Sequence, residues 1–240
     1  VDGLHPYEAT NNDAVYLRGN NINKWLVPTN RGTITLDYDP NIRNETARNL
    51  SVWRFTGNSW QNVGGTVNTS KKTITASFDG FGYYAVMYLR YGFEDVTGHP
   101  YARDYLNSMF TKGIMQARSS GNFGVYENIT RGEFATMIVK ILDLPLNYDT
   151  QNQLLTFNDV PNYAVNGALW DFRHIETAAR AGIISGLAPR IFNPGGNLTR
   201  EQAAVIIARA LNYKLGTQEK DEAALAKQFV DAGLIDFYAV

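Results

Sequence analysis

The sequence predicts an α+β multidomain protein, in which an N-terminal antiparallel β-sandwich is followed by mainly α-helical repeats. Three observations lead to this prediction. Short runs of alternating apolar and polar residues, separated by turn residues, fill residues 1–91. Beyond them, a block of sequence returns at a fixed offset of 69 residues. Each copy of this block contains a helix-start signature directly before an apolar run.

The strands of the N-terminal domain are predicted by period-two alternation. The clearest runs are residues 33–38, 50–55 and 72–78, and Gly, Pro, Asn and Asp residues lie between them. Several short strands at this spacing are typical of a β-sandwich. The domain is therefore expected to span residues 1–91.

The helical repeats are organised around two Thr-Arg sequences. Thr130 and Thr199 each stand three residues before a Glu or Gln, which is the capping-box pattern. Arg131 and Arg200 then occupy the first helical position, where a side chain projects beside the helix entrance. These second helices are expected to run from Arg131 to about Leu142 and from Arg200 to about Leu211.

The offset of 69 residues holds without a gap from Tyr101, whose counterpart is Trp170, to Leu142. The first helix of each repeat is expected around residues 101–112 and 170–181, with Gly113 and Gly182 as left-handed caps. The repeats are assigned to residues 92–155 and 156–216. Residues 217–240 start a third copy, and an alanine-rich helix is expected at residues 223–228.

Composition excludes several classes of function. A formal net charge of −1 without a basic run argues against nucleic-acid partners. No apolar stretch approaches the ~18 residues that a membrane span needs, so no membrane insertion is expected. There is no Cys, and the His residues lack metal-ligand spacing, so no metal or other cofactor is predicted. Without an initiator Met or leader, the chain is interpreted as a mature or excised piece that continues past Val240.

No catalytic constellation is found, and the chain is predicted not to be an enzyme. Paired carboxylates could hydrolyse glycosides. However, Asp95 and Asp159 occupy equivalent repeat positions, and Glu133 becomes Gln202 in the second copy, so no pair has the two different environments that acid and base need. Asp95 and Asp159 are interpreted either as caps ahead of the first helices or as ligand contacts.

The remaining chemistry favours recognition of an acidic sugar. An aromatic face can lie against the sugar ring while Arg binds the carboxylate. We expect Tyr101 to lie near Arg131, and Trp170 near Arg200. The alternatives are a structural ion pair for each Arg and ordinary core packing for the two aromatic residues.

The repeat motifs resemble those of the S-layer homology domain, from Gly92 to about Leu215. They are Phe-x-Asp-Val, Gly-Ile-x-x-Gly, a loop Phe and Ile/Leu-Thr-Arg, each present in at least one copy. The resemblance implies a pseudo-threefold prism of three repeats, of which this chain supplies a part, with ligand grooves between repeats. It also implies non-covalent anchoring of a bacterial surface protein to the cell wall. The implied partner is secondary cell-wall polysaccharide, linked to peptidoglycan and ending in a pyruvylated sugar.

Within the resemblance, Asp95 and Asp159 lie near the groove floor. The second copy keeps the family's Gly186, whereas the first has Gln116 at that position, which could narrow its site. Residues 1–91 resemble, more weakly, β-sandwich spacers of bacterial surface proteins.

Two other functions stay open. One is an assembly or adhesion module that self-associates in a surface layer, and the other is the non-catalytic part of a surface glycosidase.

Overall fold

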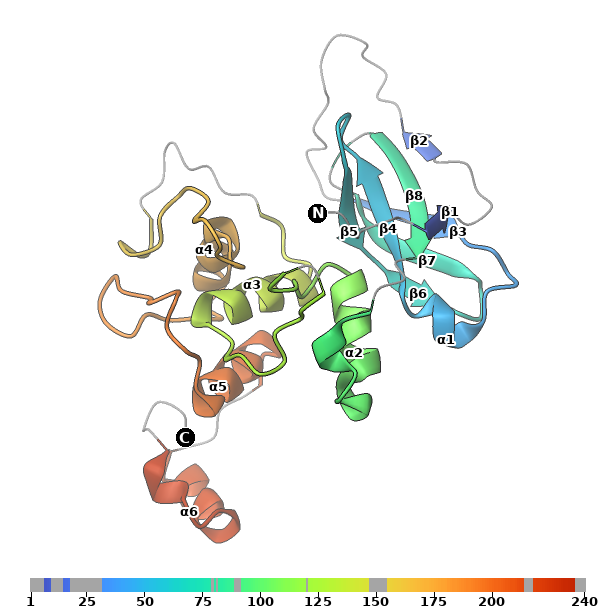
Figure 1. Cartoon of the computed structure of the whole chain (residues 1–240). Helices are drawn as coiled ribbons and strands as arrows, with labels where there is room; N and C mark the ends of the chain where they lie inside the picture. Colours follow the sequence, from blue (N-terminus) through green and yellow to red (C-terminus); the bar gives the residue numbers. More distant parts are fainter. Residues whose placement is uncertain are drawn as a thin grey trace. The chain divides into compact units, whose positions relative to one another are not determined.

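The computed structural model describes residues 7–9, 15–17, 32–78, 80, 82–88, 92–119, 121–146, 155–213 and 218–235. The chain forms two compact units, Val1–Tyr126 and Glu127–Val240. Antiparallel strands come first along the chain and helices follow, which confirms the predicted α+β content (Figure 1).

The first unit contains two antiparallel sheets. One has the strand order β1 (Tyr7–Ala9), β8 (Gly82–Tyr88), β4 (Leu50–Phe55) and β5 (Trp60–Gly64), and β2 (Val15–Leu17) also pairs with β8. The other has the order β3 (Gly32–Asp37), β7 (Thr73–Phe78) and β6 (Thr66–Asn68). A short helix, α1 (Asn44–Ala47), precedes β4. The three strands predicted from alternation are confirmed to within one residue at each end.

The inner faces of both sheets share one buried cluster. Its members include Ile34 of β3, Ile74 of β7, Val52 of β4 and Tyr84 of β8. Because successive side chains of a strand point to opposite faces, the alternation in the sequence places these residues on the same side. A shared core of this kind is what a sandwich requires. The sandwich itself stays a prediction, since most residues before Gly32 lie outside the described part of the chain.

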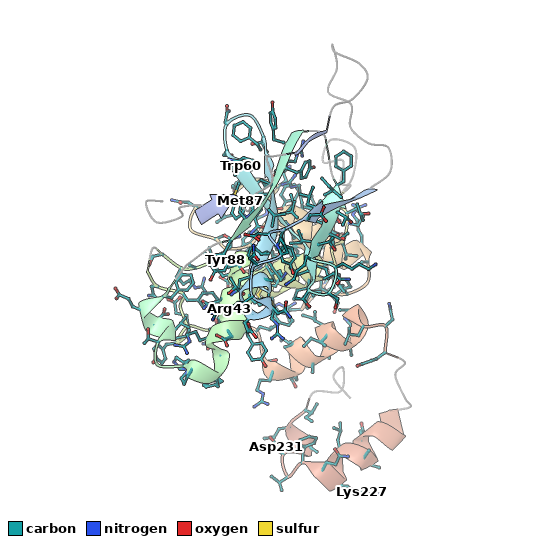
Figure 2. All side chains as sticks on the ribbon, turned by 90° about the vertical axis from the view of Figure 1, so that its right-hand side faces the viewer. Arg43, Trp60, Met87, Tyr88, Lys227 and Asp231 are labelled. Carbon is teal, nitrogen blue, oxygen red and sulfur yellow. The ribbon has the colours of Figure 1, made fainter. Side chains whose placement is uncertain are left out.

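The two faces of the larger sheet can be followed on β8. Met87 and Tyr88 are neighbours on this strand and are labelled in Figure 2. Tyr88 packs against the shared cluster, whereas Met87 is buried but is not part of that cluster. The strand is therefore covered on both faces at this end.

The first helix of the first repeat, α2 (Pro100–Thr111), is joined directly to the strand domain. The Asn62 amide donates to the carbonyl of Thr111 at 2.5 Å, and the Lys112 ammonium donates to the carbonyl of Gly65 at 2.8 Å. Burial lowers the pKa of Lys112. Gly113 has the predicted left-handed conformation (φ 71°). The strand domain thus closes the C-terminal end of α2.

This junction explains why the compact units divide the chain after Tyr126 and not at Gly92. The 3₁₀ helix η1 (Glu94–Val96) and α2 enclose a small cluster of their own. In it, the ring of Phe93 lies 4.9 Å from Phe110 and 5.2 Å from Phe123, both edge-on. The domain boundaries predicted from the repeats stay predictions, because the first compact unit contains both the strands and the start of the first repeat.

The second unit is built by both repeats. It contains α3 (Arg131–Ile141) from the first repeat, and α4 (Phe172–Arg180) and α5 (Arg200–Ala210) from the second. Its core combines Ala135 and Val139 of α3 with Ile175 and Ala178 of α4, all at most 1% exposed. The predicted starts of α3 and α5 at their Arg residues are confirmed. The expected start of α4 near Trp170 is wrong by two residues.

The third copy is present only at its beginning among the described residues. Helix α6 (Gln218–Gln228), which starts earlier than predicted, is followed by η2 (Ala232–Leu234). Figure 2 labels Lys227 in the helix and Asp231 after it. Phe229 is 52% exposed, whereas its counterparts Phe93 and Phe157 are 3% and 4% exposed.

Replacing Asn62 with Ala tests the junction between the strand domain and α2. The change removes the donor to Thr111 and leaves that part-buried carbonyl unpaired, so we expect a loss of about 1–2 kcal/mol in the free energy of unfolding. Urea denaturation measures it. The control is Asn58→Ala at an exposed turn position, with an expected change within about 0.5 kcal/mol. Equal stability of the two variants would contradict the junction.

Candidate functional site

The two second helices begin with the same capping geometry. The Thr130 hydroxyl accepts a hydrogen bond from the backbone of Glu133 at 3.2 Å, and the Glu133 carboxylate accepts one from the backbone of Thr130 at 3.0 Å. Thr199 and Gln202 repeat this capping box in α5. The helix-start prediction is therefore confirmed for both copies, and each Arg stands at the first helical position.

Arg131 is buried, with 4% of its surface exposed. Its guanidinium donates to the carbonyl of Phe192 at 2.8 Å, to the side-chain oxygen of Gln202 at 3.0 Å and to the carbonyl of Ser185 at 3.1 Å. Its central carbon also lies 4.7 Å from the centre of the Phe192 ring. A buried cation is tolerated because its donors are used in this way. All of these partners belong to the second repeat, so Arg131 ties the two repeats together.

The backbone at the start of α3 is bonded to the second repeat as well. The N–H of Arg131 donates to Gly196 and that of Gly132 donates to Pro194, both at 2.9 Å. The first N–H groups of a helix lack intrahelical partners and attract anions when they are open. Here protein carbonyls occupy them. The N-terminus of α3 is therefore a repeat–repeat junction in this structure.

Trp170 completes this junction from the second repeat. A Cβ added at Gly132 would lie 2.8 Å from Cγ of Trp170, so the ring can pack there only against a glycine. From the sequence, Trp170 is expected near Arg200 of its own repeat. The structure instead places it against the helix of the other repeat, next to Arg131.

The position of Trp170 depends on the cap of α4. The Asp171 carboxylate accepts a hydrogen bond from the N–H of Arg173 at 2.8 Å and so starts the helix after Trp170. The first repeat has Ala102 at the equivalent position, and α2 starts earlier, at Pro100. Tyr101 therefore lies in the first turn of a helix, whereas its counterpart Trp170 lies before one.

Arg200 has the opposite environment from Arg131. It is exposed, and the described part of the chain offers it no hydrogen bond or ion pair. The helices that begin with these two Arg residues also differ in burial. Ala135 of α3 is fully buried, whereas its counterpart Ala204 in α5 is exposed. The partners of Arg131 come from the repeat that follows it. Arg200 precedes the third copy, whose Phe229 is itself exposed.

Asp95 holds the loop that carries Phe123. Its carboxylate accepts hydrogen bonds from three consecutive backbone N–H groups, at residues 123–125, over 2.7–3.0 Å. Burial alone would raise the pKa of Asp95, but the hydrogen bonds from the backbone outweigh it, and the pKa lies below its ordinary value. Besides these three groups in a distant loop, the carboxylate also accepts a hydrogen bond from the backbone of Asp95 itself, so the interpretation as a local cap stays a prediction.

Asp159 performs the same task in the second repeat. It accepts from the N–H of Phe192 at 2.9 Å and from that of Asn193 at 2.6 Å. Because the carbonyl of Phe192 receives Arg131, the same peptide segment is fixed by Asp159 from one side and by Arg131 from the other. Both carboxylates, Asp95 and Asp159, thus accept hydrogen bonds from backbone N–H groups of a loop in their own repeat.

Gly186 has a steric role in the second repeat. A Cβ at this position would lie 2.6 Å from the carbonyl of Ile191 and 2.8 Å from that of Ala188, so the loop at residues 186–191 closes only over a glycine. In the first repeat Gln116 is exposed at the equivalent position.

Tyr101 is 78% exposed and its ring lies 5.9 Å from that of His99. The ring of Tyr126, which is 80% exposed, lies 5.3 Å from that of His99. Sequence reasoning missed Tyr126, although the repeat offset gives a signal for it: its counterpart is Gly195, so the aromatic ring belongs to the first copy alone.

The described residues contain neither a candidate metal site nor a candidate membrane-spanning helix. Within them, no group of three or more His, Asp or Glu residues is arranged to hold a metal ion. None of the helices seen there combines the length and hydropathy needed to cross a membrane.

Comparison with known proteins bears directly on the two repeats. Residues 92–135 and 156–204 match the model of the S-layer homology domain. Each of the two repeats therefore contains a segment that is similar to the S-layer homology domain. The residues described above, from Asp95 to Arg131 and from Asp159 to Arg200, lie inside these two segments.

Several relatives are much longer proteins. An amylopullulanase of Thermoanaerobacterium thermosulfurigenes is 30% identical over 194 residues, which make up 80% of this chain and 10% of the relative. An S-layer protein of Bacillus licheniformis is 30% identical over 139 residues, 58% of this chain and 14% of the relative. Exoglucanase XynX of Acetivibrio thermocellus is 28% identical over 213 residues, 87% of this chain and 18% of the relative.

The chain thus spans less than a fifth of each of these relatives. Residues 92–240 make up less than two thirds of the chain, so the matches to the amylopullulanase and the exoglucanase include part of the strand domain. The S-layer homology repeats and the S-layer relatives indicate a cell-surface or cell-wall location.

The two Arg residues are expected to differ in their effect on stability. Arg131→Ala removes three hydrogen bonds and leaves buried carbonyls unpaired, so we expect a loss of about 2–4 kcal/mol. Arg200→Ala changes an exposed side chain, and the expected change is within about 0.5 kcal/mol. Denaturant unfolding measures both. A large loss in Arg200→Ala would mean that this side chain has a structural partner as well.

The cap of α4 predicts a dependence of stability on pH. A hydrogen bond from His174 is the main cause that lowers the pKa of Asp171 to about 2, below its ordinary value. A depressed carboxyl pKa stabilises the fold above the unfolded value of about 3.9, and this contribution is lost as the pH falls toward 2. Asp171→Ala is expected to cost about 1 kcal/mol at neutral pH, and less below pH 4.

The matched control is Asp171→Asn, which keeps a capping oxygen but cannot titrate. Guanidinium unfolding between pH 6 and pH 2 should give this variant a shallower decline in stability than the wild type. Parallel profiles for the two proteins would show that Asp171 does not titrate as described.

Proposed function

We propose that this chain anchors a bacterial surface protein non-covalently to the cell wall by binding secondary cell-wall polysaccharide. The observation that carries the proposal is the contrast between Arg131, which is bonded inside the protein, and Arg200, which is exposed at an equivalent helix start. The S-layer homology repeats and the S-layer relatives support the wall as the partner. The relevant ligand chemistry is the acidic, pyruvylated end of the polysaccharide.

Arg200 suits such an end for two physical reasons. A guanidinium donates two parallel hydrogen bonds to a carboxylate. It also stands at the N-terminus of the eleven-residue helix α5, where the helix dipole favours a negative charge. In this proposal Arg200 contacts the pyruvyl carboxylate. Arg131, Trp170, Asp95, Asp159 and Gly186 hold the frame of the two repeats, and the exposed ring of Tyr101 offers a sugar contact.

The complete fold that we propose is a prism of three such repeats with binding grooves between them. Two features support it: α3 already docks on the second repeat, and the matching face of α5 presents exposed Ile207 and Leu211, 42% and 52% exposed. A third repeat would cover that face.

Self-association in a surface layer is the second candidate, and the same exposed face of α5 favours it. It would show as concentration-dependent association in the absence of any glycan. The glycosidase relatives suggest a further context, in which this chain serves as the non-catalytic anchor of an enzyme. Because the chain spans so little of these relatives, their activities are not assigned to it.

Co-sedimentation with purified cell walls tests the proposed function. The wild type should sediment with intact walls and stay in solution with walls stripped of the polysaccharide. Arg200→Ala should weaken binding about tenfold, equivalent to about 1.4 kcal/mol for one charged contact, while its stability stays unchanged. Arg173→Ala, at another exposed Arg of the same unit, is the control. Equal binding to stripped and intact walls would refute polysaccharide recognition.

A further inference from the structure

Three tyrosine side chains gather on the first repeat with most of their surface in water. Tyr101 and Tyr105 stand one turn apart on α2, and Tyr126 lies in the loop before α3. Their exposed fractions are 78%, 75% and 80%. Folding usually removes aromatic rings from water, and a contiguous exposed patch of this kind marks a site of interaction.

His99 connects two of these rings. The rings of Tyr101 and Tyr126 meet His99 edge-to-face, with centres 5.9 and 5.3 Å away. Each of these two tyrosines therefore has a ring contact with His99 while most of its surface stays exposed. The Nε2 atom of His99 is buried and has no hydrogen-bond partner in the described structure.

The patch is specific to the first repeat. At the repeat offset, the counterparts of Tyr105 and Tyr126 are His174 and Gly195. The counterpart of Tyr101 is Trp170, which is half-buried against Gly132. Repeat packing therefore does not require the three tyrosines.

From these observations we infer that Tyr101, Tyr105 and Tyr126, with His99, form a platform for uncharged sugar rings. The face of a pyranose ring is made of C–H groups that pack on an aromatic face, and its edge carries hydroxyls that pair with tyrosine hydroxyls. The charged residues next to the tyrosines are Arg103 and Asp104 on α2 and Glu127 after Tyr126, so they do not form a positive site for an anion. An uncharged, hydroxylated ring fits this balance better than an acidic group does.

The inference rests on the proposed function and deepens it. The acidic end of the polysaccharide would be bound by Arg200, and the tyrosine platform would bind neutral residues of the same polymer. The two contacts then depend on different chemistry and can be separated by experiment.

Cell walls with and without the pyruvyl group distinguish the two contacts, since mild acid removes the pyruvyl ketal. Tyr126→Ala and Tyr105→Ala in the full chain should weaken sedimentation about fivefold on both preparations, whereas Arg200→Ala should weaken it only on pyruvylated walls. The control is Tyr163→Ala, at another exposed tyrosine (69%) outside the platform. Binding by Tyr126→Ala equal to that of Tyr163→Ala would overturn the inference.

A direct titration keeps the inference testable if the wall assay fails. A soluble oligomer of N-acetylhexosamine, added at millimolar concentration, should shift the NMR signals of the Tyr101, Tyr105 and Tyr126 rings and not those of Tyr163. The absence of these shifts overturns the platform whatever the walls show. If sedimentation velocity shows that Tyr126→Ala abolishes self-association and the sugar causes no shift, the patch is a protein contact and the inference is wrong. Shifts without wall binding would refute the proposed function alone.

Discussion

The second unit depends on the burial of one guanidinium. Arg131 crosses from the first repeat to carbonyl and amide oxygens of the second, and the Phe192 segment that receives it is held from its other side by Asp159. A buried cation is costly unless its donors are used, so the interaction fixes both the position of α3 and the conformation of the receiving loop. Gly132 follows from this constraint, because α3 can approach Trp170 at this distance only without a side chain.

The same constraint separates two residues that the sequence presents as equals. The hydrogen-bond partners of Arg131 come from the repeat that follows it, whereas Arg200 is exposed and has no hydrogen-bond or ion-pair partner among the described residues. Repeats that stack in this way bury their faces on their neighbours and leave the last face exposed. The same Thr-Arg helix start can therefore join two repeats in one copy and, in our proposal, bind a ligand in the next. The strand domain also contacts the first repeat, because the Asn62 amide donates a hydrogen bond to the carbonyl of Thr111 at the C-terminal end of α2.

The repeats also give Asp95 and Asp159 equivalent environments. Both carboxylates accept hydrogen bonds from backbone N–H groups of a Phe-containing loop. The features without repeat equivalence, Arg200 in its open setting and the tyrosine platform of the first copy, are where recognition is proposed. The matches to the amylopullulanase and the exoglucanase extend from the repeats into the strand domain.

The sequence by itself determined the local structure. Thr130 and Thr199 with their capping partners gave the starts of α3 and α5, alternation gave the strands, and Gly113 and Gly182 gave the helix ends, because caps, turns and periodicity act over a few residues. Only the tertiary structure decided which Arg is buried, that Trp170 faces the other repeat, and that the Asp carboxylates bind distant loops. Those contacts join residues that lie 28 to 71 positions apart, and no local pattern specifies such partners.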